Sequence, residues 1–273
     1  RMAHWDKIAI KRDNWQGMGR WYHQRLAEIY KFLVSPNQRI LEIGCGTGNL
    51  ISQLHPSHGV GIDFSSEMIE RAKKQNPKIE YYQLDAHDLS SLAGEFDVII
   101  LSDTINDLWD VQRVLEQIKK FCKPNTRIIL NFYSHLWQFP LAIAQSLNLA
   151  SPLMSQNWLT REDVENLLRL AGFETISSMR EVLFPLPLGG FANRYLVKLF
   201  PFYNFALSNF IVARPMPTSA NQPSVSVVVA ARNEAGNIKN IFERVPKMGS
   251  KTELIFVEGH SKDNTYQTIL DEI

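Results

Sequence analysis

Three glycines at alternate positions, Gly44, Gly46 and Gly48, follow a largely apolar run at residues 39–43. A helical pattern opens directly after them, at Asn49. Glycines in this arrangement let the backbone turn sharply and approach a ligand where any Cβ atom would clash. The first turn of the following helix would present amide groups and a partly positive end to that ligand. The residues therefore predict a nucleotide-type binding site built from a strand, a glycine turn and a helix.

Acidic residues stand at the ends of the first three predicted strands. Glu42 lies at the end of the first strand, Asp63 follows the run at 59–62, and Asp85 follows the run at 79–84. A carboxylate at Glu42 would repel a pyrophosphate, but it suits a ligand with an amino group and a sulfonium. We expect Asp63 to accept hydrogen bonds from two ribose hydroxyls, and Asp85 to accept one from an adenine amino group. The glycine spacing is G-x-G-x-G, whereas dinucleotide folds show G-x-G-x-x-G.

These motifs, in this order, resemble those of the class I S-adenosylmethionine-dependent methyltransferases, and the resemblance covers about residues 15–215. It implies a Rossmann-like, doubly wound, seven-stranded α/β sheet and S-adenosyl-L-methionine as the cofactor. It also implies methyl transfer to a small-molecule, sugar or lipid-linked acceptor. A Rossmann-like domain that binds no methyl donor, or that binds it without turnover, is the alternative. The cofactor-binding residues that the resemblance implies are Glu42, Gly44, Cys45, Gly46, Gly48, Asp63, Phe64, Met68, Asp85, Ala86 and Ser102.

The fourth and fifth predicted strands, residues 96–101 and 126–132, lead into polar side chains. In a doubly wound sheet the first and fourth strands diverge, and ligands lie at the carboxyl ends of the strands there. We therefore take Asp103 and His135 as the candidate catalytic residues, because a side chain at this mouth can accept a proton from the acceptor. Asn106 is in position for the donor's amino group or for the acceptor. For His135, packing or hydrogen bonding is the alternative role.

Helical spacing and cap residues indicate the helices around this site. A helix over residues 20–33 either covers the cofactor, with Tyr22 and His23 lining the site, or packs as an amphipathic helix on the sheet edge. Ser65 or Ser66 is expected to cap the helix after the second strand, and Thr160 to cap a later one. One of Asp107 and Asp110 is expected to cap the helix after the fourth strand.

Residues 184–203 are rich in Phe, Leu and Pro and lie between the sixth and seventh strands, expected at 174–183 and 205–213. Three interpretations are open. The segment forms an apolar roof over the acceptor site, an interfacial surface that reaches a lipid-linked acceptor, or a packed crossover helix. We expect a crossover helix for most of these residues and a roof for a few.

A proline-rich, polar linker at residues 215–224 separates a methyltransferase domain at 1–214 from a segment at 225–273. In that segment, Asn233-Glu234 and the acids after its second strand resemble the opening of a family 2 glycosyltransferase of the GT-A fold. The common paired acids are Glu258-Gly259 here, and the metal-binding D-x-D is missing. The arrangement resembles bacterial two-domain methyltransferase–glycosyltransferase proteins, so we expect the natural product to continue beyond residue 273. A nucleotide-sugar-dependent glycosyltransferase with an accessory methyltransferase domain is the alternative function.

Composition and charge bear on partners and location. The formal net charge of +1 gives no basis for electrostatic capture of nucleic acid. Cys45 and Cys122 are the only cysteines, and their expected places at opposite sheet edges predict free thiols and a cytoplasmic location. His55 and His58 have no further ligand nearby in the chain, so no metal site is expected. No uninterrupted apolar run is long enough to span a membrane, and peripheral membrane contact is a further expectation.

Overall fold

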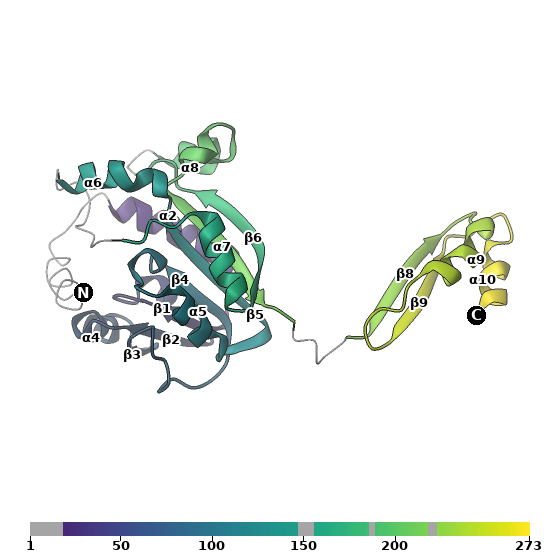
Figure 1. Ribbon diagram of the computed structural model, residues 1–273, viewed down its shortest axis with the longest axis horizontal. Coiled ribbons are helices and arrows are strands. Elements are labelled where there is room, and N and C mark those ends of the chain that lie inside the picture. Colours follow the sequence, from purple (N-terminus) through teal and green to yellow (C-terminus); the bar gives the residue numbers. More distant parts are fainter. Residues whose placement is uncertain (1–18, 147–155, 186–188, 218–222) are drawn as a thin grey trace. The chain divides into compact units, whose positions relative to one another are not determined.

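The computed structural model describes residues 19–146, 156–185, 189–217 and 223–273. The chain divides into two compact units after Met216. The first unit contains the predicted methyltransferase elements and the second contains the last two strands and helices (Figure 1).

The first unit is built on a seven-stranded sheet with the strand order β3-β2-β1-β4-β5-β7-β6. The first five strands in this order are parallel, and β7 runs antiparallel to both β5 and β6. This confirms the predicted doubly wound sheet, with its switch point between β1 and β4. The strands are β1 (Arg39–Ile43), β2 (His58–Asp63), β3 (Glu80–Gln83), β4 (Phe96–Ser102), β5 (Cys122–Tyr133), β6 (Phe173–Glu181) and β7 (Ser208–Pro215).

Helices cover both faces of this sheet, as Figure 1 shows for α2 on one face and α5 and α7 on the other. Because the central strands are buried on both faces, they are apolar at nearly every position. The α-helices are α2 (Gly19–Leu33), α3 (Asn49–Gln53), α4 (Ser66–Gln75), α5 (Val111–Lys119), α6 (Gln138–Ser146), α7 (Arg161–Leu170) and α8 (Gly190–Arg194). The 3₁₀ helices are η1 (Ile105–Asp107), η2 (His135–Trp137), η3 (Leu196–Lys198) and η4 (Phe202–Phe205).

Alternate residues of each central strand enter two separate cores. Ile40 of β1 packs in one core with Tyr30 of α2, whereas its neighbour Leu41 packs in the other with Val114 of α5 and Leu168 of α7. All five side chains are fully buried. Deleting one such aliphatic side chain typically costs about 2–5 kcal/mol. The two cores therefore hold α2 and α7 firmly against opposite faces of the strands that carry the site.

The predicted helix caps are present. The Ser65 hydroxyl accepts a hydrogen bond from the Met68 amide at 3.3 Å, and the Asp110 carboxylate accepts one from the Arg113 amide at 2.9 Å. Thr160 and Asp163 form a capping box at the start of α7. These caps satisfy helix amides that have no partner within the helix.

The prediction of a crossover helix for most of residues 184–203 is wrong. Between β6 and β7 the described residues form only short pieces, α8, η3 and η4, and several of their aromatic side chains are exposed. Proline and glycine interrupt the segment too often for a continuous helix. The strand before it also ends earlier than expected, at Glu181, because Val182 takes a left-handed backbone angle, φ +64°, that turns the chain.

The second unit consists of β8 (Val225–Ala231), α9 (Ala235–Arg244), β9 (Thr252–Glu258) and α10 (Thr265–Glu272). The two strands are parallel, in the register Val225 to Thr252, and a small core of Ala231, Ile238 and Ile269 lies under the helices. The predicted strands and helices are thus present. A GT-A-like fold is not shown by this small unit, since two strands and two helices are shared by many α/β folds.

Candidate functional site

The glycine turn after β1 has left-handed backbone angles at all three glycines, with φ of +71° at Gly44, +52° at Gly46 and +72° at Gly48. Packing also excludes side chains at two of them. A Cβ atom on Gly44 would lie 2.6 Å from the Thr104 hydroxyl, and one on Gly48 would lie 2.1 Å from the Tyr81 hydroxyl. A Cβ atom on Gly46 would meet nothing within 4 Å. Gly46 is therefore the point at which the backbone is open to a ligand.

Asp63, at the end of β2, holds this turn in place. One carboxylate oxygen accepts a hydrogen bond from the Gly46 amide at 2.9 Å, and the other accepts one from the Ser65 amide at 2.9 Å. The side chain is largely buried, at 9% exposed. A carboxylate has about four acceptor positions, so these two bonds are compatible with the predicted contact to ribose hydroxyls. The ribose contact itself stays a prediction.

Glu42 is almost completely buried and accepts a hydrogen bond from the Ile51 amide, in α3, at 3.1 Å. Burial raises its pKa from 4.5 to about 8; the Ile51 amide opposes the rise and the nearby charge of Asp63 adds to it. A buried carboxyl of this kind is stabilised in its ionised form by a cationic group. This is the electrostatic property expected beside a sulfonium or an ammonium group.

The residues predicted on the adenine side lie after β2 and β3. Phe64 is half-buried, Met68 is buried in α4, and Ala86 packs partly against the core. Asp85 is exposed, and its Oδ1 accepts a hydrogen bond from the His87 amide at 2.9 Å and contacts the His87 ring nitrogen at 2.6 Å. Although burial opposes it, these contacts lower the pKa of Asp85.

The Cys45 side chain belongs to the core rather than to the open side of the turn. It is buried, and a Cβ atom on Gly61 would lie 2.9 Å from its sulfur. Burial raises the pKa of this thiol, with a smaller contribution from the charge of Glu42. Within the turn, the Cys45 amide donates to the Ile62 carbonyl at 2.9 Å, and the thiol donates to the Gly46 carbonyl at 3.7 Å. Both cysteines are free, as predicted.

A largely buried polar network lies across the switch point, at the carboxyl ends of β4 and β5 and the amino end of the antiparallel strand β7. Oδ1 of Asp103 accepts hydrogen bonds from the Tyr22 hydroxyl at 2.7 Å and from the Asn131 amide group at 2.6 Å. The Tyr22 hydroxyl also contacts the Ser208 hydroxyl at 2.9 Å, and the Tyr30 hydroxyl donates to Oδ1 of Asn131 at 2.7 Å. Asp103 adopts a left-handed backbone angle, φ +53°, which is uncommon outside glycine and tolerated best by Asp and Asn.

The two tyrosines in this network remain protonated. Burial raises the pKa of both Tyr22 and Tyr30 well above its usual value, and the charge of Asp103 raises it further. Each phenol is therefore a hydrogen-bond donor, and neither is a base near neutral pH. The Asp103 carboxylate accepts hydrogen bonds within this group of side chains.

Asn106 and Thr104 hold the loop after β4. The Asn106 side chain donates to the Asn157 carbonyl at 2.8 Å and accepts from the Tyr133 amide at 2.9 Å. The Thr104 hydroxyl donates to the carbonyls of Ile43 and Ser102, both at 3.0 Å. Asn106 is fully buried, and these bonds give it a positioning role in the loop; its contact with a ligand stays a prediction. Ser102 itself is half-buried at the end of β4.

His135 lies apart from Asp103. It is exposed at the start of η2 and lines a cavity of about 220 Å³ together with Arg161, Arg180 and Asn209. Asp103 does not line this cavity. Of the two candidate catalytic residues, only Asp103 therefore belongs to the network at the switch point, and a catalytic role for either residue stays a prediction.

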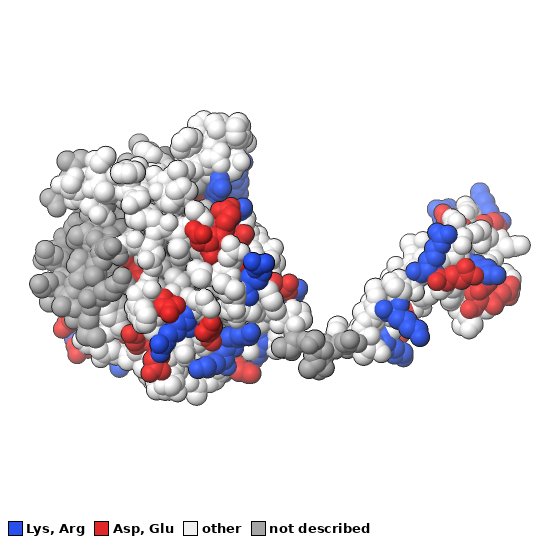
Figure 2. Space-filling view, in the orientation of Figure 1, with Lys and Arg blue, Asp and Glu red and all other residues white. Residues whose placement is uncertain are grey.

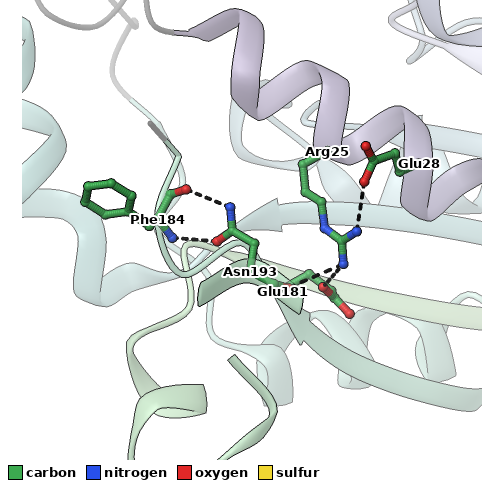
Figure 3. A network of polar contacts seen from close by, with 5 residues as sticks. All are labelled: Arg25, Glu28, Glu181, Phe184 and Asn193. Carbon is green, nitrogen blue, oxygen red and sulfur yellow. Dashed lines mark hydrogen bonds and ion pairs between the residues drawn. The ribbon is translucent and has the colours of Figure 1, made fainter. Parts of the chain in front are cut away.

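The position of α2 over the site is fixed by a second polar network, drawn in Figure 3. The Arg25 guanidinium forms ion pairs with Glu28 at 2.9 Å and with Glu181, at the end of β6, at 3.1 Å. Arg25 also donates to the Asn193 carbonyl at 3.4 Å, and the Asn193 side chain donates to and accepts from the Phe184 backbone at 2.7 Å. These contacts connect α2 to the segment after β6.

Sequence reasoning identified Asp103 but missed Tyr30, Asn131 and Ser208. Asn131 is a polar residue inside the apolar run of β5, and Ser208 begins β7 beside Asn209. A buried polar residue in a central strand needs a hydrogen-bond partner, and this was the available signal. Among the described parts of the chain there is no group of three residues suited to hold a metal ion. In those same parts, no helix has the length and apolar character needed to cross a bilayer.

The family model for a methyltransferase domain matches residues 34–172, which is just over half of the chain. An O-methyltransferase, cnsE, from Penicillium expansum is 26% identical over 197 residues, covering 64% of this chain and 71% of that protein. A demethylmenaquinone methyltransferase from Paenarthrobacter aurescens is 28% identical over 112 residues, which cover 38% of this chain and 44% of that protein.

Among solved structures, the chain is similar to an S-adenosylmethionine-dependent methyltransferase from Thermotoga maritima, described as a possible histamine N-methyltransferase. The TM-score is 0.61 at 19% identity, and the match covers 78% of this chain and 98% of that one. At this identity the similarity shows the fold. The family match ends before the second unit, and none of these comparisons supports the glycosyltransferase alternative for residues 225–273.

Proposed function

We propose that this chain methylates a small-molecule acceptor. The chain belongs to the methyltransferase-domain family and is an S-adenosylmethionine-dependent methyltransferase. The acceptor would approach the carboxyl ends of β4 and β5, beside Asp103 and Tyr22. The single observation that carries this proposal is the buried network around Asp103, because it combines a carboxylate with two phenols that remain hydrogen-bond donors.

The residues of the donor half fit S-adenosylmethionine. Gly46 has open space at its Cβ position. The side chains of Asp63 and Glu42 accept hydrogen bonds from amides within the turn and just after it. When bound, the cofactor supplies a methyl group activated by a sulfonium. We infer that Glu42 favours the cationic part of the donor and that Asp63 accepts from its ribose, with Phe64, Met68 and Asp85 on the adenine side. These roles would orient the methyl group toward the switch point.

On the acceptor side we propose that Asp103 accepts the proton of an acceptor hydroxyl. The acceptor oxygen would take up the methyl group that the donor supplies, while the hydroxyl proton would pass to the Asp103 carboxylate and the demethylated donor would leave as a neutral thioether. Tyr22 and Asn131 hold Oδ1 of Asp103 and so fix the direction of the carboxylate. Holding the two reactants near each other and aligned would supply much of the acceleration.

The surroundings favour an acceptor with a ring. The Tyr22 and Tyr133 rings lie 5.9 Å apart at the same mouth, and aromatic side chains pack well on flat ligands. The names of two relatives, an O-methyltransferase and a demethylmenaquinone methyltransferase, point to the same class. We therefore propose a hydroxylated ring compound, such as a phenol or a hydroquinone, ahead of a sugar or lipid-linked acceptor.

The substitution Asp103→Asn tests this proposal. Asparagine tolerates the left-handed backbone angle and retains the side-chain shape, so the fold should be kept. We expect turnover on a panel of phenols and hydroquinones to fall roughly 10²–10⁴-fold, the usual contribution of a general base. Binding of S-adenosylmethionine, measured by calorimetry, should stay within about twofold.

His135→Ala and Asp88→Asn are the matched comparisons. His135 is the other candidate base, and its replacement should leave turnover close to that of the wild type because His135 lies outside the network around Asp103. Asp88 is exposed and should also have no effect. If His135→Ala abolishes turnover while Asp103→Asn does not, the proton acceptor is His135 and the proposal for Asp103 is wrong.

A further inference from the structure

Two segments of the methyltransferase unit carry an exposed apolar surface. One is η2 with α6, between β5 and α7, and the other runs from α8 to η4, between β6 and β7. The Trp137 indole in η2 donates to the Phe205 carbonyl in η4 at 2.8 Å, which joins the two segments. We call this the aromatic surface and define it by Phe139 (77% exposed), Ile143 (61%), Phe191 (66%), Leu199 (54%), Phe200 (78%) and Phe205 (58%).

This surface differs from the scattered apolar residues of an ordinary protein exterior. None of the residues of α6 is buried, and the helix contains no charged residue. Leu141 packs partly against the core, but Phe139 and Ile143 of the same helix face water, where helix residues are normally polar. Contiguous exposed apolar side chains of this kind mark contact with a partner or a membrane.

The segments that form the aromatic surface carry charges of one sign, although Glu162 of α7 lines a cavity beside Leu136 and Ala206. No Asp or Glu occurs between Glu181 and Glu234, whereas Arg194 and Lys198 lie within this stretch and are exposed. Residues 136–160 contain no Asp, Glu, Lys or Arg at all. Figure 2 shows the atoms over α6 and α8 as white, with blue atoms at their border and red atoms next to the blue ones. An apolar surface whose own segments carry only cations is complementary to an anionic lipid surface.

We propose that the aromatic surface docks on the face of a membrane that contains anionic phospholipid. The apolar side chains would enter the boundary between headgroups and acyl chains, while Arg194 and Lys198 would reach the phosphates. A second copy of the chain is a poorer occupant, because a two-fold contact would bring these cations together without an acid from the same stretch. This inference goes beyond the proposed function, and it stands whether or not Asp103 is a base.

The experiment is flotation of the 273-residue chain with vesicles of 30% phosphatidylglycerol in phosphatidylcholine and with vesicles of phosphatidylcholine alone. We expect binding to the anionic vesicles to exceed binding to the neutral ones by about tenfold, and to weaken at high salt. The double variant Phe191→Ser, Leu199→Ser should lose at least about tenfold on both kinds of vesicle. The variant Arg194→Gln, Lys198→Gln should lose binding only on the anionic vesicles.

The matched control is Phe32→Ser with Lys31→Gln, in α2. Phe32 is 87% exposed but lies outside the aromatic surface, so vesicle binding should be unchanged. Thermal melting and calorimetry with S-adenosylmethionine check that each variant is folded. Absence of vesicle binding by the folded wild type would overturn the proposal. Vesicle binding that all variants retain would also overturn it. A dimer seen by sedimentation that the double variant Phe191→Ser, Leu199→Ser converts to a monomer, together with no vesicle binding, would overturn it as well.

Discussion

The donor half and the acceptor half of the sheet's carboxyl edge hold their acids in different ways. In the donor half, Glu42 and Asp63 accept hydrogen bonds from backbone amides that are 9, 17 and 2 residues away in the chain. In the acceptor half, Asp103 accepts from side chains 81 and 28 residues away, on α2 and β5.

The difference separates what the fold supplies from what this chain adds. A carboxylate held by backbone amides depends on the path of the main chain, so most residue types nearby can change without loss of the bond. A carboxylate held by Tyr22 and Asn131 depends on the side chains themselves. We infer that the donor half serves a cofactor common to the family, and that the acceptor half is adapted to the substrate of this chain.

Glu42→Gln gives the largest expected effect in the donor half. The pKa of Glu42 is about 8 in the folded protein and 4.5 in the unfolded chain, so the folded state favours the protonated form. That stabilisation is fully present below about pH 4.5 and is lost as the pH rises through about 8. Relative to the variant, the wild type should lose at most about 4 kcal/mol of unfolding free energy between pH 5 and 9. Urea unfolding of both proteins across this range measures the effect.

Glutamine keeps an oxygen that accepts from the Ile51 amide, so the variant isolates the ionisation of Glu42. Glu67→Gln, in the first turn of α4, is the control and should change with pH as the wild type does. Parallel pH profiles for wild type and Glu42→Gln would show that the buried carboxyl does not titrate in this range.

Replacements in the glycine turn give the next largest effect. Gly48→Ala should lower the unfolding free energy by about 2–4 kcal/mol, because the left-handed angle costs about 1–2 kcal/mol and the Tyr81 ring must also move. Gly46→Ala should cost only about 1–2 kcal/mol, since its Cβ atom meets nothing. Chemical denaturation compares the two variants.

Gly46→Ala, which costs less stability than Gly48→Ala, should nevertheless weaken the binding of S-adenosylmethionine. Its methyl group would occupy the open space at the turn, and we expect the affinity measured by calorimetry to fall at least about tenfold. Equal loss of stability in the two variants would contradict the packing argument. Unchanged affinity in Gly46→Ala would show that the donor does not approach the turn at this point.

The difference between the two halves also explains what could be predicted from the sequence. The glycine turn and the cap at Ser65 follow from local patterns, and the structure has both. The doubly wound sheet is implied by the resemblance to class I methyltransferases, and the observed strand order agrees with it. The links from Asp103 to Tyr22 and from Asn131 to Tyr30 join distant parts of the chain, and residue spacing carries no information about them.

The segment between β6 and β7 was mispredicted for a different reason. The expected crossover helix would bury its apolar side chains, as apolar side chains usually do in a core. Phe191 and Phe200 are instead exposed, at 66% and 78%. Composition alone does not distinguish an apolar segment that is buried in the core from one that faces a membrane or a partner. Both kinds of segment are rich in the same apolar side chains.

The smallest expected effect concerns the second unit. Both halves of the site belong to a sheet whose last paired residue is Pro215, opposite Phe173, and the Met216 amide donates to the Gly172 carbonyl at 2.9 Å. A chain that ends after Pro217 keeps every one of these contacts. We expect its melting temperature to shift by less than about 2 °C and its affinity for S-adenosylmethionine to stay within about twofold of the full chain.

A chain that ends after Ala213 is the matched comparison. It loses the last rungs of β7 and the exposed ion pair between Arg214 and Glu174 at 2.6 Å, which is itself worth about 1 kcal/mol or less. Its melting temperature should fall by several degrees, about 2–4 °C for each kcal/mol lost. Loss of cofactor binding in the chain that ends after Pro217 would contradict this prediction. It would show that the second unit contributes to cofactor binding together with the two halves of the sheet edge.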